Sequence, residues 1–375
     1  SLDLSFWVDA IICDYNYAFD PRVYLRRFFI EESESTSRKF AFLVDEANNM
    51  VDRSREMFSA ELFKQPVLDV RRAVKGQVKD IYNALGRINT KLVAMRKECK
   101  EEGNSMAMET YPGELTPLLR RFISTAEQWL IKNIKTPFRQ EVMDLYFEVN
   151  WFLKVVENYN GTYAFCLDET DDDFRIKLFC IDPSAQLSEA FERSRSVVFF
   201  SATLSPVDYF RHILGCDPEA RQLSLPSPFP PENFCLTVAD RVSTLFKYRQ
   251  KTKTNIARLI GSLVRQHPGN YLIFFPSYQY MKMVYEVFLL LSPGIEIIVQ
   301  RPGMTEPERD EFLENFSDSN RSEGKTLAGF AVMGGVFGEG IDLKGDRLTA
   351  AVVVGVGLPG ICLERELIKD YFGQL

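Results

Sequence analysis

Short apolar runs alternate with amphipathic stretches along the chain. The runs at 10–13, 40–44 and 197–200 are four or five residues long and predict buried strands. From residue 206 onward, helical and strand patterns follow one another regularly. The expected helices are 256–265, 281–291 and 306–316, and the expected strands are 271–275, 296–299, 327–332 and 350–354. This alternation predicts an α/β fold with a parallel sheet and right-handed crossovers.

The segment between residues 51 and 160 has a helical pattern instead. Its apolar side chains recur every three or four residues, as on one face of a helix. The clearest stripe consists of Val70, Val74, Val78, Ile81, Leu85, Ile88 and Leu92. Strand-like runs return at 162–167 and 175–181. We therefore expect an all-helical insertion, spanning 53–160, within an α/β domain.

Composition narrows the class of protein. Of the 375 residues, 46% are hydrophobic and 26% are charged, which predicts a soluble globular chain with more than one domain. The net charge of -7 excludes a wholly basic nucleic-acid binder, but not a local basic patch. The seven cysteines form no C-x-x-C pair and there are two histidines, so neither a zinc site nor a disulfide framework is indicated. Buried thiols and the lack of a membrane span or signal peptide predict a reducing, cytoplasmic location.

The run at 40–44 leads directly into Asp45 and Glu46, within the string LVDEANN. Open α/β sheets place their ligands at the carboxyl ends of strands. In nucleotide hydrolases an Asp at such a position orients Mg²⁺, usually through water, and an adjacent Glu polarises the attacking water. The alternative is a helix N-terminus, where acids interact favourably with the helix dipole. The string alone leaves both interpretations open.

Two further strings place polar side chains at expected strand ends. Ser201 and Thr203 follow the strand 197–200, where their hydroxyls either link two elements or cap a helix. Phe275 and Ser277 either present a ring and a hydroxyl to a nucleic-acid backbone or form an ordinary turn.

A glycine-rich loop follows the expected strand 327–332. Its glycines and acids are Gly334, Gly335, Gly338, Glu339, Gly340 and Asp342. Such a loop lets backbone N–H groups approach phosphates closely, and the acids can hold a ribose, a cation or a basic partner. The alternative is a flexible turn.

The stretch 71–100 is strongly basic. Its cations are Arg71, Arg72, Lys75, Lys79, Arg87, Lys91, Arg96, Lys97 and Lys100. Only Asp80 and Glu98 oppose these nine within the stretch, which gives a local charge of +7. It is either a surface that neutralises nucleic-acid phosphates or a solvated helix face.

Taken in order, these strings resemble the motifs of the XPD/DinG-like family of superfamily 2 DNA helicases. The DEAN string at 45–48 stands where the family has a DEAH-type Walker B motif, with Asn48 in place of His. SATLSP at 201–206 is similar to motif III, IFFPSY at 273–278 to motif IV, and 334–348 to motif V. The helical segment is similar to the family's Arch insertion.

The resemblance implies two RecA-like parallel-sheet domains, the first incomplete, with an all-helical Arch-like insertion. The expected boundaries are 1–52 for part of RecA-like domain 1, 53–160 for the insertion, 161–205 for the remainder of domain 1, and 206–375 for domain 2. It also implies part of an ATP-dependent helicase that moves 5′ to 3′ on single-stranded DNA, of a repair or replication type. The P-loop, the four cysteines of an iron–sulfur cluster and the arginine-bearing motif VI are expected outside residues 1–375, so we expect this stretch alone to be inactive.

The resemblance also implies roles for individual residues. Asp45 would position Mg²⁺ through water, and Glu46 would activate the attacking water. The residues expected to couple ATP to the motor are Asn48, Ser201, Thr203, Gly338, Glu339, Gly340 and Asp342. The residues expected to contact DNA are Phe275, Ser277, Arg71, Arg72, Lys75 and Lys79. Two rival functions stay open: a non-enzymatic DNA- or protein-binding module with the helicase fold, and another Mg²⁺-dependent phosphohydrolase or nuclease.

Overall fold

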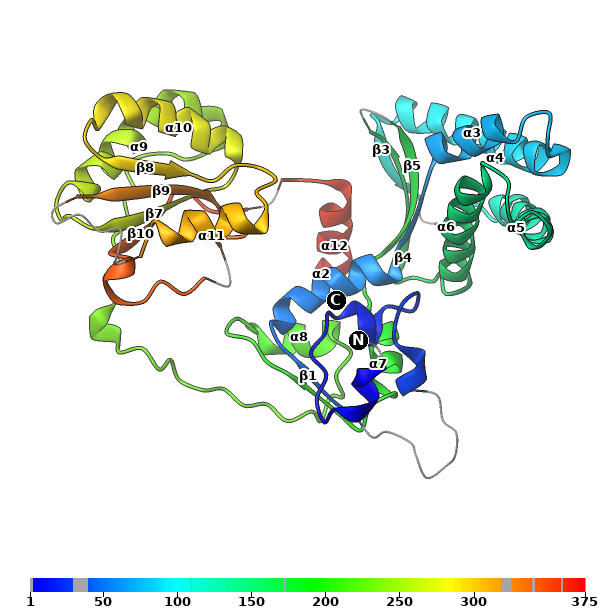
Figure 1. Ribbon diagram of the computed structural model, residues 1–375, viewed down its shortest axis with the longest axis horizontal. Coiled ribbons are helices and arrows are strands. Elements are labelled where there is room, and N and C mark those ends of the chain that lie inside the picture. Colours follow the sequence, from blue (N-terminus) through cyan, green and yellow to red (C-terminus); the bar gives the residue numbers. More distant parts are fainter. Residues whose placement is uncertain are drawn as a thin grey trace. The chain divides into compact units, whose positions relative to one another are not determined.

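The computed structural model describes residues 3–29, 40–108, 110–170, 173–317, 325–338, 341–358 and 360–374. The chain divides into two compact units. Unit 1 comprises Ser1–Ser224 together with Ile361–Leu375, and unit 2 comprises Leu225–Gly360 (Figure 1). Over these described ranges, no helix combines the length and the apolar character needed to cross a bilayer.

A pair of parallel strands organises the first part of unit 1. Strand β1 (Ala41–Val44) pairs with β6 (Ser196–Phe199), and Val44 lies opposite Phe199. The helices of this part are α1 (Asn16–Phe19), α2 (Ala47–Phe58), α7 (Ser184–Phe191) and α8 (Val207–Ile213), with 3-10 turns at Leu4–Trp7 and Arg26–Phe28. These helices and β1 share one apolar core, to which they contribute Phe19, Met50, Leu187, Ile213 and Val44. Because the strands are parallel, the residues that follow them leave the sheet at the same edge.

A four-stranded antiparallel sheet forms the second part of unit 1, with the strand order β2–β5–β4–β3. The strands are β2 (Ala60–Phe63), β3 (Ser105–Met108), β4 (Tyr163–Glu169) and β5 (Phe174–Cys180). The helices are α3 (Lys64–Ala73), α4 (Lys79–Glu101), α5 (Leu115–Lys132) and α6 (Arg139–Glu157). Most of the helical stripe predicted from the sequence is buried, including Val70, Ile81, Leu85 and Ile88, and Val78 is half-buried.

The inserted segment is not all-helical, because β2 and β3 interrupt it. Both strands are only four residues long, which is too short for a two-residue repeat to stand out. The sequence of β3, SMAM, also contains two methionines, a residue type whose intrinsic propensity favours helix. Tertiary pairing decides their conformation: β2 pairs with β5, and β3 pairs with β4. As a result, β4 and β5 join the sheet of the insertion rather than the parallel strands of unit 1.

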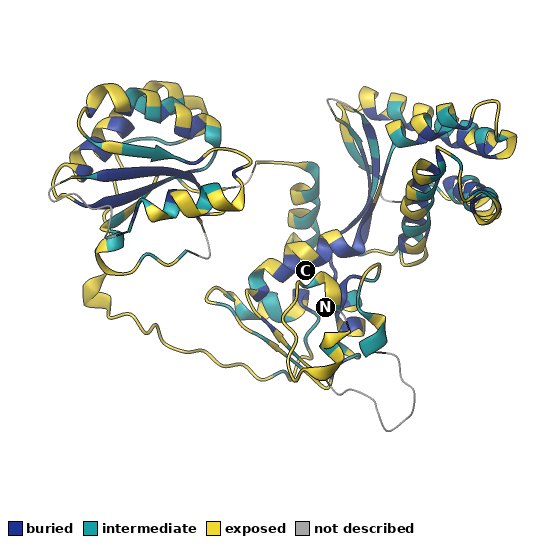
Figure 2. Ribbon diagram, viewed as in Figure 1, coloured by how far each residue is buried: buried dark blue, intermediate teal, exposed yellow. Residues whose placement is uncertain are grey.

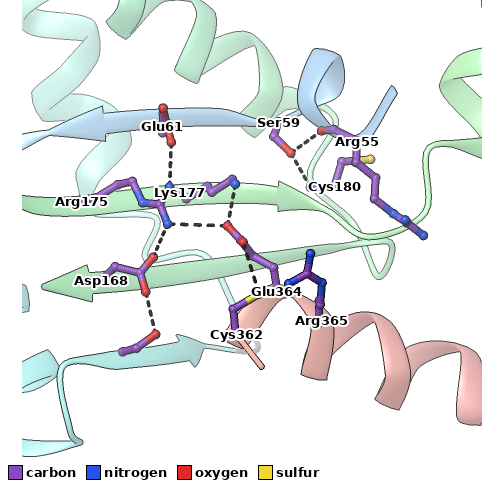
Figure 3. Close-up of polar contacts among 11 residues, drawn as sticks. Arg55, Ser59, Glu61, Asp168, Arg175, Lys177, Cys180, Cys362, Glu364 and Arg365 are labelled. Carbon is purple, nitrogen blue, oxygen red and sulfur yellow. Dashed lines mark hydrogen bonds and ion pairs between the residues drawn. The ribbon is translucent and has the colours of Figure 1, made fainter. Parts of the chain in front are cut away.

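The last helix, α12 (Leu363–Gly373), also belongs to unit 1 and packs on this antiparallel sheet. Its apolar residues Leu363, Leu367, Ile368, Tyr371 and Phe372 contact a cluster of Ala164, Cys166, Phe179 and Ile181. Figure 3 shows that Glu364 reaches the strands: it accepts a hydrogen bond of 2.6 Å from Lys177 Nζ and lies 3.6 Å from Arg175 Nη2. The boundary expected from the sequence places this helix in domain 2, at 206–375, whereas its contacts are with unit 1.

Unit 2 is built on a parallel sheet with the order β10–β7–β9–β8. The strands are β7 (Asn270–Phe275), β8 (Glu296–Val299), β9 (Leu327–Val332) and β10 (Ala350–Val353). The helices are α9 (Arg249–Val264), α10 (Tyr278–Leu291) and α11 (Glu306–Glu314), with 3-10 turns at Pro231–Asn233, Phe246–Tyr248 and Gly345–Arg347. The two central strands are buried along most of their length (Figure 2). The α/β class and the parallel sheet predicted from the alternation are confirmed.

Candidate functional site

Asp45 and Glu46 form the turn that joins β1 to α2. Glu46 has left-handed backbone angles, φ 46° and ψ 46°, and stands at the N-cap of α2. For a residue with a side chain this conformation costs roughly 1–2 kcal/mol. Strained backbone of this kind persists only where the surroundings fix it, and it is concentrated at functional sites. Asp45 Oδ1 braces the turn by accepting a hydrogen bond of 2.8 Å from the Glu46 backbone N–H.

Tyr15 is a residue that the sequence analysis missed. Its hydroxyl lies 2.5 Å from the carbonyl oxygen of Asp45 and 3.0 Å from that of Glu46, so it holds the acidic turn from outside. Burial and then the charges of Asp45 and Glu46 raise the pKa of the Tyr15 phenol, which therefore stays a donor at neutral pH. The only signal in the sequence was its place in the string DYNYAFDP, which no spacing rule connects to residue 45.

Ser201 stands beside this turn, at the end of the neighbouring strand. Its Oγ lies 2.6 Å from Asn48 Oδ1 and 3.3 Å from Glu46 Oε2. A hydroxyl carries one proton, so it donates to one of these acceptors at a time, and the shorter contact favours Asn48. Ser201 Oγ also accepts from the Thr203 backbone N–H at 3.3 Å, and Thr203 Oγ1 lies 3.4 Å away. The structure thus brings Glu46, Asn48, Ser201 and Thr203 together at one edge of the sheet.

The backbone fixes this meeting point. Phe200 N–H donates to the Val44 carbonyl at 3.0 Å, and Ala47 N–H donates to the Phe200 carbonyl at 3.2 Å. These two bonds extend the parallel pairing past both strand ends, so the acidic turn and the Ser201 segment cannot slide independently.

Within the described part of the chain, no group of three or more His, Cys, Asp or Glu side chains is placed to hold a metal ion. Asp45 and Glu46 still fit Mg²⁺, because this ion keeps several waters and commonly takes one or two carboxylates together with substrate phosphates. Both carboxylates are exposed, and one oxygen of Asp45 is already used by the Glu46 N–H. The donor set suits an ion carried in with a nucleotide better than a resident ion.

Phe275, the aromatic residue expected to contact DNA, lies in the core of unit 2. Phe275 is 0% exposed, and its ring stacks on Phe330 with centroids 5.7 Å apart. The expectation that Phe275 contacts DNA is therefore wrong, because the ring belongs to the inward face of β7. Ser277 caps α10 and accepts from the Tyr280 N–H at 3.3 Å. Its proton remains available to a ligand.

The glycine-rich loop follows β9 and is braced from inside unit 2. Gln300, which is 3% exposed, accepts from the Val332 N–H at 2.8 Å and donates to the Tyr278 hydroxyl at 3.1 Å. A Cβ on Gly335 would lie 2.9 Å from Gln300 Nε2 and 3.0 Å from the Val332 carbonyl oxygen, a close approach that favours glycine there. Gly338 closes a turn by donating to the Gly335 carbonyl at 2.8 Å.

The acidic part of this loop is described only in part. Glu339 and Gly340 lie outside the described residues. Asp342 is exposed and forms an ion pair of 2.8 Å with Lys344, which raises the pKa of that lysine. The predicted roles of Gly338, Glu339, Gly340 and Asp342 stay predictions.

Tertiary structure neutralises much of the basic stretch at 71–100. The ion pairs are Arg72–Asp69, Lys91–Glu114, Arg96–Glu169, Lys97–Glu101 and Lys100–Glu169. All four of these acids lie outside the stretch 71–100. Among the described residues, Arg71, Lys75, Lys79 and Arg87 make no such ion pair. The cations without such an ion pair therefore lie between residues 71 and 87 of the stretch.

Comparison with known proteins finds a matching family model and similar helicases. The family model described as Helicase C-terminal domain matches residues 260–374. The ATP-dependent DNA helicase CHL1 of Debaryomyces hansenii is 22% identical over 375 aligned residues, which cover 88% of this chain and 46% of the relative.

Two solved structures share the fold. One is an XPD helicase with a TM-score of 0.54 and 16% identity, covering 99% of this chain and 63% of the other. The second is the structure of S. tokodaii Xpd4, with a TM-score of 0.54 and 15% identity, covering 96% of this chain and 69% of the other. At these identities the two solved structures show a shared fold, and the family model describes a helicase C-terminal domain over residues 260–374. The chain spans about half the length of the curated relative.

Proposed function

We propose that this chain is part of an ATP-dependent DNA helicase. The observation that carries the proposal is the edge at which Asp45 and Glu46 meet Ser201 and Thr203, joined through Asn48. A strained acidic turn beside a hydroxyl cluster at the carboxyl end of parallel strands suits phosphate chemistry. The similarity to helicases in sequence and fold supports it.

We assign a role to each residue at this edge of the sheet. Asp45 would hold Mg²⁺, which would neutralise charge on the phosphates when bound. Glu46 accepts a proton from, and orients, the attacking water. Ser201 senses the state of Glu46 because its hydroxyl can switch between Asn48 Oδ1 and Glu46 Oε2. Thr203 then passes this change into the segment that follows β6.

We further propose an incomplete RecA-like domain 1, an Arch-like insertion whose sheet includes β4 and β5, and a RecA-like domain 2 that ends before α12. Single-stranded DNA with 5′ to 3′ movement is the proposed track, and Ser277, Arg71, Lys75 and Lys79 are its proposed contacts. Arg72 is the weakest candidate, because Asp69 already pairs with it at 3.1 Å. A cytoplasmic location stays a prediction, supported by seven cysteines that form no disulfide.

The test is the variant Glu46→Gln in the intact protein that contains this chain. The amide keeps the size of the side chain and loses the charge that orients water, so DNA-stimulated ATP hydrolysis should fall at least a hundredfold while ATP binding persists. Glu56→Gln is the matched control, since it makes the same change on the same helix, away from the edge. Turnover near wild type in Glu46→Gln would remove the assigned role. DNA binding without any ATP turnover in the wild-type protein would favour a non-enzymatic module.

A further inference from the structure

A polar pocket of about 520 Å³ lies between α3, α4 and α5 of the insertion. This volume is within the range of small-ligand sites, about 300–1,000 Å³. Its lining includes Arg71, Arg87, Arg121, Asp80, Tyr82 and Gly86. Three guanidinium groups face one carboxylate there, so the pocket carries a net positive charge. The sequence did not reveal it, because Arg121 lies on a separate helix, outside the basic stretch at 71–100.

The three arginines are not satisfied by acids of the protein. Among the described residues, neither Arg71, Arg87 nor Arg121 forms an ion pair with a carboxylate. Other arginines of these helices do: Arg96 pairs with Glu169, and Arg120 pairs with Glu157. Arginines that converge on a cavity without acidic partners are suited to an anionic ligand, since their planar groups match phosphate oxygens.

Arg71 is held ready for such a ligand. Its guanidinium lies 4.4 Å from the centre of the Tyr82 ring, and its Nη2 donates to the Tyr82 hydroxyl at 3.1 Å. Its Nε is buried and has no hydrogen-bond partner among the described residues, so the protein itself leaves part of this guanidinium unsatisfied. A Cβ at Gly86 would lie 3.4 Å from that Nε. A side chain at Gly86 would therefore lie directly against the Arg71 guanidinium, on the pocket wall that both residues form.

We propose that this pocket binds a backbone phosphate of a single-stranded nucleic acid. The proposal rests on the proposed helicase function for the presence of such a strand. Lys75 follows α3 and Lys79 begins α4; both are exposed, have no ion pair among the described residues, and continue the positive charge beyond the pocket. A polymer that extends beyond the pocket can use these lysines, whereas a free phosphate ion cannot. This favours the strand over the ion.

The test measures binding of a fluorescein-labelled (dT)20 strand to the protein by anisotropy over a range of salt. The double variant Arg87→Gln/Arg121→Gln should make the log–log salt slope shallower by about 0.7, the value for one phosphate of a single strand. Gly86→Met should weaken binding severalfold without changing any charge, because its side chain fills the pocket. Asp80→Asn should tighten binding, since it removes the opposing carboxylate. Lys97→Gln is the matched control: it removes a charge from α4 outside the pocket.

Several results would overturn the proposal. One is a (dT)20 affinity in Gly86→Met equal to that of wild type. Another is a loss in Lys97→Gln as large as in the double variant. Inorganic phosphate at constant ionic strength separates the two sources of phosphate: pocket variants that change its binding but not that of (dT)20 would assign the site to a free anion. Glu46→Gln reports on ATP turnover alone, so failure of the helicase proposal would be seen separately from failure of the pocket.

Discussion

Replacing Glu364 by Ala should loosen the contact of α12 with the antiparallel sheet. Glu364 joins a network on the strands, because it accepts from Lys177 Nζ at 2.6 Å and lies 3.6 Å from Arg175 Nη2 (Figure 3). Arg175 keeps two other partners, Asp168 at 2.7 Å and Glu61 at 3.1 Å. Lys177 loses its nearest carboxylate. The substitution therefore destabilises the protein mainly through the loss of the Lys177–Glu364 ion pair.

The free-energy cost depends on how far the Lys177–Glu364 ion pair is shielded from solvent. The side chain of Lys177 is 16% exposed and that of Glu364 is 29% exposed. Fully exposed pairs contribute about 0–1 kcal/mol, and breaking a fully buried pair costs about 3–5 kcal/mol. A partly shielded pair lies between these limits, at about 1–2 kcal/mol. Since 1.4 kcal/mol is a factor of ten in an equilibrium constant, local opening of α12 should become about tenfold more frequent.

Hydrogen exchange measured by mass spectrometry tests this directly. Amides of α12 should lose about tenfold in protection in Glu364→Ala, while those of unit 2 stay unchanged. Glu366→Ala removes the same charge from the same helix at an exposed position and should change protection little. The double variant with Lys177→Met should be less than additive, because both substitutions remove one interaction. Equal effects of Glu364→Ala and Glu366→Ala would refute the argument.

Two further outcomes are expected. Hydrogen bonding from Arg96 lowers the pKa of Glu169. The ionised Glu169 should therefore stabilise the fold fully above the unfolded pKa of about 4.3, and this stabilisation should be lost as the pH falls through the lower folded pKa. Glu169→Gln should flatten the pH dependence of thermal stability between pH 5 and 3, and an unchanged pH profile would contradict this. Tyr15→Phe removes the single phenol proton that the Asp45 and Glu46 carbonyls share, so exchange at 45–48 should rise by an amount equivalent to about 0.5–1.5 kcal/mol, and ATP turnover should fall. Retained protection at these amides would show that the turn does not need the phenol.

The sequence alone determined the features that depend on neighbours in the chain. The apolar runs at 271–275 and 327–332 were enough to predict the two central strands of the parallel sheet of unit 2, because a fully buried strand needs continuous apolar residues. The position of Asp45 and Glu46 at a strand end was predicted for the same reason. Their proximity to Ser201 was implied by resemblance only, since 155 residues separate Glu46 from it.

Tertiary structure decided whatever depends on partners distant in the chain. The strands at 60–63 and 105–108 exist because β5 and β4 supply their hydrogen bonds. Phe275 is a core ring rather than a nucleic-acid contact because Phe330 lies against it. In the basic stretch, Asp69, Glu101, Glu114 and Glu169 neutralise five cations, while Arg121 joins Arg71 and Arg87 around one pocket. A charge counted along the sequence takes no account of these partners, because electrostatic interaction depends on distance in space.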